Sequence, residues 1–231
     1  MLTPLNKNTL YIVSTPIGNL KDITIRGLEV LSQVDLLLVE DTRSIQFLLK
    51  TYKISPNRII SYHSHNERAR IEEVLKALQS QSVALVSEAG TPLICDPGIL
   101  LIKEVIKNKI PIVSIPGVSA FTTLLPITGF PLSDFYFAGF LSSKISKKKN
   151  QLLLLKELKT LLIIYESVHR IKETVGFLKD IFPSENEMVI GRELTKEFET
   201  IYRGTLQEIN TIVFATDFVC KGEFCIIINN R

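Results

Sequence analysis

The feature that most constrains the fold of this chain is the alternation of short apolar runs with helix-like segments through its first half. The apolar runs occupy residues 10–14, 36–39, 58–61, 83–87 and 111–115. Continuous apolar runs of this length are typical of strands that are buried on both faces of a sheet. Between the third and fourth runs, Ile71, Val74, Leu75 and Leu78 recur at the spacing of one helical face, and Asn66 is the expected N-cap. Strands that alternate with helices predict an α/β domain with a mostly parallel sheet.

Glycine and proline residues gather where the first, fourth and fifth of these strands are expected to end. They occupy the turns 16–18, 89–92, 96–98 and 116–117. Any one of these turns is explained well enough as an ordinary connection between a strand and a helix. In open α/β sheets, however, ligands bind outside the carboxyl ends of the strands, and glycine allows a close approach of the backbone. Several such turns on one edge therefore predict a ligand site there.

The second half of the chain has a different pattern. Strands are expected at 135–140, 160–165, 187–190 and 223–228, a helix at 168–181, and a hairpin around 200–204. These strands no longer alternate regularly with helices, which favours a mixed sheet. Residues 142–150 form a polar stretch that carries Lys144, Lys147, Lys148 and Lys149. We place a domain boundary near residue 118, which gives an N-terminal domain of residues 1–117 and a C-terminal domain of residues 118–231.

Composition excludes several classes of protein. Apolar residues make up 45% of the 231 residues and charged residues 22%, which is typical of a globular protein and not of a disordered or fibrous one. The net charge of +3 is compatible with a nucleic-acid partner without requiring one. Cys95, Cys220 and Cys225 lack the spacing of a disulfide framework or a zinc site. Without a signal-peptide pattern, and with apolar runs far short of the ~20 residues of a membrane span, the sequence predicts a soluble cytoplasmic protein with no membrane partner.

Two familiar nucleotide-binding devices are absent, namely the G-x-G-x-x-G fingerprint and the P-loop, as is the G-x-S-x-G nucleophile elbow. His63 and His65 form a pair that is capable of binding a metal, but no third ligand is visible nearby. We therefore expect no metal, and hydrogen bonding at the edge of a cleft is the better reading of the pair. His63 as an ordinary packing residue stays open as well.

Charged residues at two places allow two readings each. Glu40 and Asp41 follow the second strand and precede a helix, so they either cap that helix or serve a functional site. Arg43 beside them is suited to bind phosphate or to hold the carboxylates. The lysines at 144–149 are more often a solvated surface than a binding patch, and they favour RNA contact only if another feature points to RNA.

Several motifs that occur in order along the chain together point to RNA. They include Y-I-V-S-T-P-I-G-N-L-K-D-I-T at 11–24, E-D-T-R at 40–43, S-Y-H-S-H-N-E at 61–67, A-L-V-S-E-A-G-T-P-L-I at 84–94 with D-P-G at 96–98, P-G-V-S-A at 116–120, F-Y-F-A-G-F at 135–140, Y-E-S-V-H-R at 165–170 and R-E-L-T-K at 192–196. Over residues 10–228 the chain resembles the ribosomal RNA small subunit methyltransferase I family, a branch of the tetrapyrrole methylase superfamily.

The resemblance implies two α/β domains of the tetrapyrrole methylase type with a cofactor cleft between them, and a homodimer. It implies 2′-O-methylation of a cytidine ribose in small-subunit (16S) ribosomal RNA with S-adenosylmethionine as the methyl donor, and RNA rather than DNA as partner. Carried onto this chain, the cofactor-binding positions are Pro16, Ala89, Gly90, Thr91, Ile94, Ser119, Ala120, Tyr165 and Leu194.

Methyl transfer to a ribose hydroxyl benefits from a base near the ligand edge. The candidates are Glu40, Asp41, His63 and Glu67, and the sequence does not choose among them. The candidates for RNA binding are Arg43, Arg170, Lys196 and the lysines at 144, 147, 148 and 149.

The chain departs from the family pattern at Glu88, Cys95 and Val168, where aspartate, serine and proline are usual. Many relatives also carry a further C-terminal segment, so we expect this chain, which ends at Arg231, to grip the ribosomal subunit differently.

Two rival functions stay open. One is methylation of a tetrapyrrole or another small acceptor by the same superfamily. The other is a non-catalytic ribosome-binding module that keeps an inactive cofactor cleft.

Overall fold

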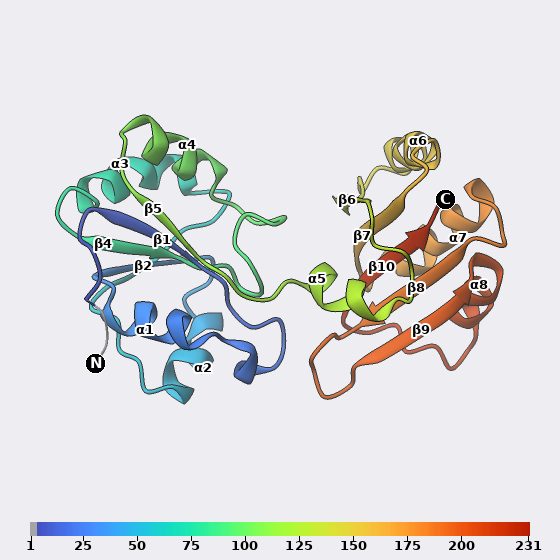
Figure 1. Cartoon of the computed structure of the whole chain (residues 1–231), viewed down its shortest axis with the longest axis horizontal. Helices are drawn as coiled ribbons and strands as arrows, with labels where there is room; N and C mark the ends of the chain where they lie inside the picture. The colour runs from blue at the N-terminus through green and yellow to red at the C-terminus, as the bar shows by residue number, and fades with distance from the viewer. Residues whose placement is uncertain (1–3) are drawn as a thin grey trace. The chain divides into compact units, whose positions relative to one another are not determined.

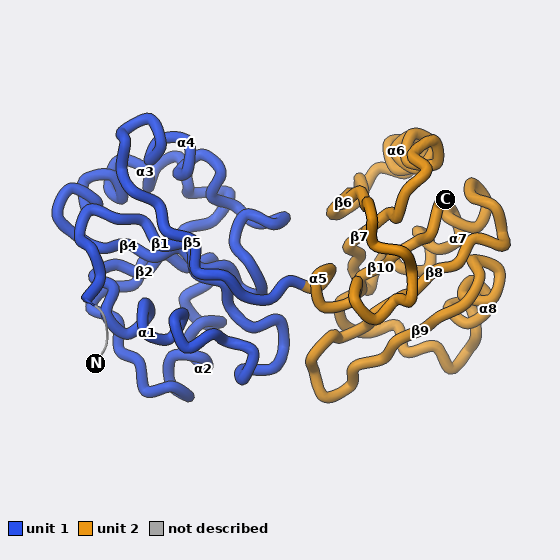
Figure 2. Tube along the Cα trace, viewed as in Figure 1, with its two compact units in different colours: residues 1–119 blue, residues 120–231 orange. Residues whose placement is uncertain are grey.

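The computed structural model describes residues 4–231, which divide into two compact units, unit 1 up to Ser119 and unit 2 from Ala120 to Arg231 (Figure 2). Among these residues, no helix has the length and apolar character needed to span a membrane. Both units are α/β, as the sequence predicts, and each has its own sheet and its own apolar core (Figure 1).

Unit 1 is built on a parallel five-stranded sheet in the order β3-β2-β4-β1-β5. Its strands are β1 (Thr9–Val13), β2 (Leu36–Val39), β3 (Ile59–Ser61), β4 (Ser82–Leu85) and β5 (Ile112–Ile115). Its helices are α1 (Ile25–Gln33), α2 (Ser44–Thr51), α3 (Glu67–Ala77) and α4 (Ile99–Lys107), with a 3-10 turn at Leu20–Asp22. The five strands match the apolar runs of the sequence to within two residues at each end, because strands covered on both faces leave no room for polar side chains.

Two apolar layers cover the sheet of unit 1. One joins alternate strand residues to α1 and α2 and the other joins the remaining strand residues to α3 and α4. Val74 and Leu78 of the predicted helical face are fully buried in the second layer. Asn66 occupies the N-cap position as predicted, but its side chain bonds elsewhere, accepting from the backbone N–H of His63 at 2.8 Å and donating to the carbonyl of Ser61 at 3.1 Å. Asn66 thus holds the turn after β3 rather than the helix.

Unit 2 has a mixed five-stranded sheet in the order β6-β7-β10-β8-β9, as the sequence predicts. Its strands are β6 (Phe135–Phe140), β7 (Leu161–Ser167), β8 (Glu187–Arg192), β9 (Thr200–Thr205) and β10 (Glu223–Asn229). Only β6 and β7 pair in parallel, and the other neighbours are antiparallel. The helices α6 (Ile145–Lys156), α7 (Ile171–Ile181) and α8 (Leu206–Phe214) share one apolar core with this sheet.

Three details of unit 2 correct the sequence reading. The polar stretch 142–150 is largely helical and opens α6, whose buried Leu152 and Leu155 fix it to the sheet. The hairpin expected around 200–204 is in fact β9 itself, and its connection to β8 runs through 193–199. The helix α8, begun by a capping box between Thr205 and Glu208, follows directly. A short helix α5 (Ala120–Leu124) and a 3-10 turn (Leu125–Ile127) precede β6.

Candidate functional site

The carboxyl ends of the parallel strands in unit 1 carry most of the residues that the sequence singles out. The first residues after the five strands are Ser14 after β1, Glu40 after β2, Tyr62 after β3, Val86 after β4 and Pro116 after β5. β1 and β4 are neighbours, but the helices that follow them lie on opposite faces of the sheet. Ligands of open α/β sheets bind at such a switch of direction.

Hydrogen bonds tie the loops after β1, β4 and β5 together. The backbones of Thr15 and Gly90 exchange two bonds, of 2.9 and 3.0 Å. The hydroxyls of Ser14 and Thr91 lie 3.0 Å apart, and Thr91 also donates to the carbonyl of Val118 at 3.0 Å. The candidate cofactor positions on these three loops (Pro16, Ala89, Gly90, Thr91, Ile94 and Ser119) therefore share one rigid cradle.

Two features favour glycine at position 90. Its φ of +84° lies in the left-handed region that other residues rarely adopt. A Cβ there would also lie 3.3 Å from Cγ2 of Ile17 and 3.5 Å from the carbonyl oxygen of Val118. A side chain would thus narrow the space between the loops after β1 and β5.

The remaining cofactor candidates, Ala120, Tyr165 and Leu194, meet at α5 in unit 2. The Tyr165 hydroxyl accepts a bond from the backbone N–H of Phe121 at 3.1 Å, next to Ala120. Leu194 is buried, and a Cβ on the nearby Gly191 would lie within 3.1 Å of both Leu194 and Leu124. The expectation of a cofactor cleft between the two domains stays a prediction.

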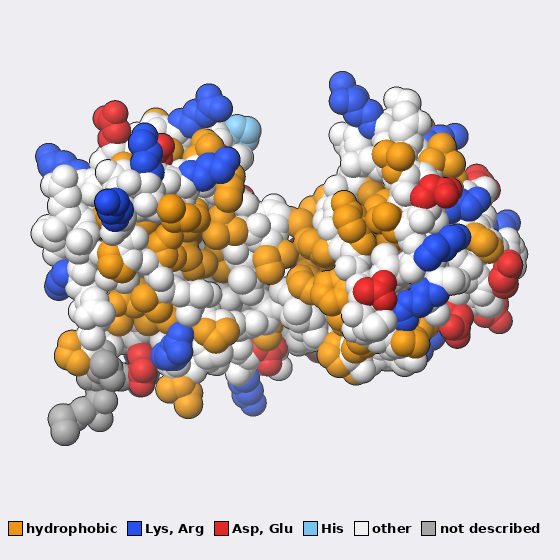
Figure 3. Space-filling model, turned by 45° about the horizontal axis from the view of Figure 1, so that its top comes forward, with side chains coloured by type: hydrophobic (Ala, Val, Ile, Leu, Met, Phe, Trp, Pro, Cys, Tyr) orange, Lys and Arg blue, Asp and Glu red, His pale blue; other side chains and the backbone are white. Residues whose placement is uncertain are grey.

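Sequence reasoning missed an aromatic cluster around Tyr165. The ring of Phe137 stacks on that of Phe121 with centroids 4.9 Å apart and meets the edge of Tyr165 at 5.0 Å. Phe140 lies 5.8 Å from Tyr165 and is half exposed, so part of this cluster contributes to the apolar surface of unit 2 (Figure 3). The spacing of aromatic residues on the predicted strand 135–140 was the signal that could have found it.

Three of the four candidate bases, Asp41, Glu67 and His63, differ in their hydrogen-bond partners, and the fourth, Glu40, lies partly buried directly after β2. Asp41 is held by Arg43, whose backbone N–H and guanidinium bond its carboxylate at 2.7–3.2 Å, and these bonds lower the Asp41 pKa to about 2. Glu67, at the start of α3, accepts the backbone N–H of Gly98 at 3.2 Å. Nδ1 of His63 is buried and has no hydrogen-bond partner among the described residues.

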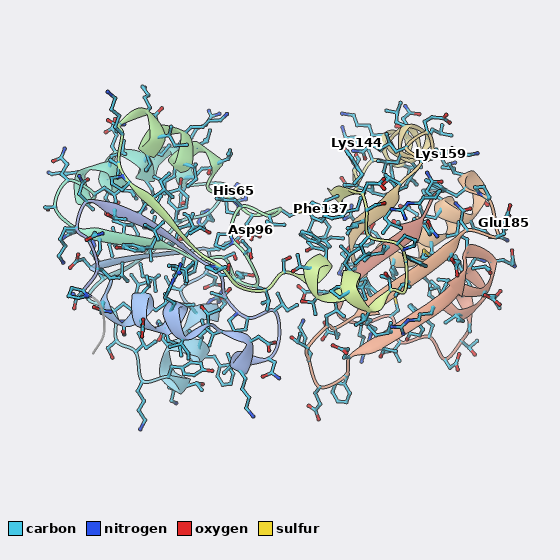
Figure 4. All side chains as sticks on the ribbon, viewed as in Figure 1. His65, Asp96, Phe137, Lys144, Lys159 and Glu185 are labelled. Carbon is cyan, nitrogen blue, oxygen red and sulfur yellow. The ribbon has the colours of Figure 1, made fainter. Side chains whose placement is uncertain are left out.

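A further carboxyl, Asp96, was quoted in a motif but not chosen as a candidate. It lies on the loop 91–98 at the carboxyl end of the sheet, on the side of unit 1 where His65 is also labelled (Figure 4). Partial burial, with repulsion from Glu40 and Glu88, raises the pKa of Asp96 to about 6, although a bond from the Ser87 side chain opposes that shift. The pKa of Asp96 is thus shifted in the opposite direction to that of Asp41 at the same edge.

Within residues 4–231, no group of three His, Cys, Asp or Glu side chains is arranged to hold a metal ion. The rings of His63 and His65 lie edge to face with centroids 5.9 Å apart.

One RNA-binding candidate is contradicted by the structure. The Lys148 side chain is fully buried and donates to Glu173 Oε1 at 2.6 Å and to Thr174 Oγ1 at 3.1 Å, with the buried Glu166 at 3.9 Å. In helix α6 the residue lies on the face of Leu152 and Leu155, which turns it inward. Lys148 is a structural residue and does not face RNA.

The other basic candidates fall into two groups. Lys144, Lys147 and Lys149 are exposed at the start of α6, and we call them the α6 lysines. Arg43, Arg170 and Lys196 are each held in ion pairs, with Asp41, Glu166 and Glu193 respectively. Arg170 also donates to the carbonyl of Leu141 at 3.0 Å, so its guanidinium is largely engaged within unit 2.

Curated relatives named ribosomal RNA small subunit methyltransferase I include one from Leptospira biflexa, 42% identical over 97% of this chain and 92% of the relative. Another, from Mycoplasmopsis pulmonis, is 43% identical over 94% of this chain and 96% of the relative.

Solved structures share the fold at low identity. Diphthine synthase superposes with a TM-score of 0.73 at 16% identity and covers 95% of this chain and 89% of its own. Uroporphyrin-III C-methyl transferase from Thermus thermophilus, complexed with S-adenyl homocysteine, gives 0.67 at 14% identity and covers 95% of this chain and 96% of its own.

The family model described as Tetrapyrrole (Corrin/Porphyrin) Methylases matches residues 9–210, which includes most of each unit. Together with relatives more than 40% identical over nearly the whole length, this match identifies the family. The chain belongs to the tetrapyrrole methylases.

Proposed function

We propose that this protein transfers a methyl group from S-adenosylmethionine to the 2′-oxygen of a cytidine in small-subunit ribosomal RNA. The observation that carries the proposal is the identity of 42% to a ribosomal RNA small subunit methyltransferase over 97% of the chain. The sequence motifs of that branch lie on the loops that form the site, which supports the same assignment.

The cradle after β1, β4 and β5 suits S-adenosylmethionine. A Cβ at Gly90 would intrude on the space beside Ile17 and Val118, and the paired hydroxyls of Ser14 and Thr91 fix the loops around it. The donor-binding residues proposed on this cradle are Pro16, Ala89, Gly90, Thr91, Ile94 and Ser119, and Ala120, Tyr165 and Leu194 stay separate candidates for donor contact. The donor supplies an electrophilic methyl group on a sulfonium, and the protein has to align the acceptor oxygen with that group.

The α6 lysines are the side chains best placed to bind the RNA backbone. Lysines at the start of a helix oppose its dipole, and the first turn of α6 carries no acidic residue to compensate. The exposed cations at this helix start therefore favour phosphate. Arg43 and Lys196 are secondary contacts, because each already holds a carboxylate.

The proposal extends to the assembly and location that suit this substrate. The protein works as a homodimer in the cytoplasm, where small ribosomal subunits are its partner. DNA, which lacks the 2′-hydroxyl, is not a substrate.

Methylation of small subunits that lack the modification tests the proposal. The purified protein, given S-adenosylmethionine with a labelled methyl group, incorporates label into the rRNA, and the product resists alkaline cleavage at one position because a methylated 2′-oxygen cannot attack the adjacent phosphate. Label that appears in a tetrapyrrole acceptor but not in subunits would support the rival reaction of the superfamily. Binding of the donor without label in any acceptor would support the non-catalytic module.

A further inference from the structure

A β-bulge in the edge strand β6 turns the side chain of Phe140 toward an aromatic face of unit 2. Phe137 lies opposite Ile163 of β7. The register then shifts by one residue near Gly139, whose φ is +63°, and Phe140 lies opposite Tyr165. Side chains three residues apart on a regular strand point to opposite faces, whereas Ile163 and Tyr165, two residues apart, share one. The bulge therefore brings Phe137 and Phe140 onto the same face of the sheet.

The face that Phe140 joins is a connected cluster of aromatic rings. The centroids of Phe137 and Phe140 lie 5.0 and 5.8 Å from that of Tyr165, and Phe121 stacks on Phe137 at 4.9 Å. The hydroxyl of Tyr165 is held by the backbone N–H of Phe121 at 3.1 Å, which fixes its ring. Phe140 is 52% exposed and Phe135, at the other end of β6, is 45% exposed. The cluster thus presents aromatic surface to solvent on a support that is already ordered.

The chain around these rings is basic without compensating acids. No aspartate or glutamate occurs between Phe135 and Lys156. Lys144 follows Phe140 by four residues, so their Cα atoms lie no more than about 14 Å apart. Phe137 and Lys144 also lie on the same side of unit 2 (Figure 4). The other two α6 lysines follow in the same helix and are exposed as well.

Exposed rings beside exposed cations are the combination that binds single-stranded nucleic acid. The rings stack on bases and the cations attract phosphates. A second copy of this chain would cover the rings too, but it would bring an identical set of uncompensated lysines to the same interface. Like charges placed together oppose such an association, so the charge of this surface favours RNA as its occupant.

We propose that Phe140 stacks on an unpaired base of the ribosomal RNA substrate while the α6 lysines bind neighbouring phosphates. This inference rests on the proposed function and adds how the substrate is held, namely as a single-stranded segment with its bases unstacked from one another. Every base has an aromatic face, so this contact positions the RNA without selecting its sequence. Phe140 is accordingly a substrate-binding residue, and its loss affects affinity for RNA rather than affinity for the donor.

Single-turnover methylation of unmodified small subunits at increasing subunit concentration tests this role with the full chain. Phe140→Leu keeps an apolar side chain but removes the ring, and Phe140→Tyr keeps the ring. Phe140→Leu is expected to raise the half-saturating subunit concentration about 5- to 150-fold, the factor that corresponds to loss of one base–aromatic stack. Phe140→Tyr is expected to stay within about threefold of wild type. Phe214→Leu on α8, where the ring is 53% exposed, is the matched control and is expected to change nothing.

Fluorescence provides a second readout that does not depend on activity. The chain has no tryptophan, so Phe140→Trp introduces a single fluorophore at the proposed stacking position. Short oligocytidylate RNA is expected to quench its emission, whereas RNA of the same length with abasic residues, which keeps the phosphates, is not. Phe214→Trp is the control and is expected to keep its emission with either RNA.

Four results would overturn the role of Phe140. They are a half-saturating concentration for Phe140→Leu within about twofold of wild type, a Phe140→Trp emission that oligocytidylate does not quench, equal quenching by abasic RNA, and a Phe140→Leu affinity for S-adenosylmethionine that falls by the same factor as its affinity for subunits. An emission that changes with protein concentration alone would assign the ring to an interface between two copies. Wild-type protein that transfers no methyl group to subunits would refute the proposed function, while quenching by oligocytidylate still decides the stacking role separately.

Discussion

Replacing Lys148 by methionine tests whether this lysine belongs to the core of unit 2 or to an RNA surface. Its ammonium bonds Glu173 and Thr174 and lies 3.9 Å from Glu166, whose side chain is fully buried. Removing one partner of a buried ion pair costs about 3–5 kcal/mol, since the remaining charge stays without compensation. Glu166 keeps the Arg170 guanidinium at 2.8 Å and the Thr174 hydroxyl at 2.7 Å, so we expect the lower end, about 3 kcal/mol.

Urea unfolding of the full chain, followed by circular dichroism, measures this change against Lys147→Met as the matched control. Lys147 is the exposed neighbour in the same helix, and its replacement is expected to change the free energy of unfolding by less than about 0.5 kcal/mol. A drop of about 3 kcal/mol is a large part of the stability of a domain this size, so the transition of unit 2 shifts visibly. Equal stability of the two variants, with weaker RNA binding by Lys148→Met alone, would refute the structural role.

Three further predictions concern the cradle, the α6 lysines and Asp96. Gly90→Ala is expected to weaken donor binding at least tenfold, as measured by calorimetry. Gly129 has a similar φ of +81° and no atom within 4 Å of an added Cβ, so Gly129→Ala introduces the same backbone strain and is expected to leave donor binding unchanged. Equal losses of donor affinity in the two variants would show that backbone strain alone is responsible. Changing the three α6 lysines to glutamine is expected to raise KM for subunits and to flatten the salt dependence of subunit binding, because fewer counterions are released. Donor affinity is the control and is expected to stay the same. An unchanged salt slope would show that these lysines are only a solvated surface. The Asp96 pKa in the folded protein, about 6, lies above the ordinary 3.8, so its contribution to stability is present below pH 4 and is lost as pH rises through 6. Asp96→Asn should therefore be more stable than wild type by about 1 kcal/mol at pH 7.5, after allowance for screening of a partly exposed group, and equal to it at pH 4; thermal unfolding at both pH values decides.

The fold of unit 1 could be read from the sequence because burial on both faces forces its strands to be apolar without interruption. The strand predicted at 36–39 is observed at those residues, and the others differ by two residues or fewer at each end. The helix α6 was missed because its first turn is polar and lysine-rich, so its apolar face appears only at Leu152 and Leu155. The helix α8 was missed because its start depends on a capping box at Thr205 that the predicted hairpin obscured.

Only part of the candidate site could be predicted from the sequence, because the sequence shows which residues follow a strand but not which atoms those residues contact. The topology places Glu40, His63 and Gly90 on the loops of one edge. Whether a carboxylate there is neutralised depends on tertiary contacts, and Asp41 and Asp96 differ for that reason. Lys148 is a second example: it is one of several neighbouring lysines, and it alone is buried because it lies on the helix face of Leu152 and Leu155.

The acceptor atom is the most direct test of the proposed reaction. Small subunits reconstituted with a single deoxyribose at the target cytidine lack only the 2′-hydroxyl, and subunits reconstituted with ordinary ribose serve as the control. We expect labelled methyl from S-adenosylmethionine to enter the control rRNA and not the deoxyribose-containing rRNA, while both subunits bind the protein with similar affinity. Equal incorporation into both would place the methyl group on another atom and contradict the assignment of a ribose 2′-O-methyltransferase.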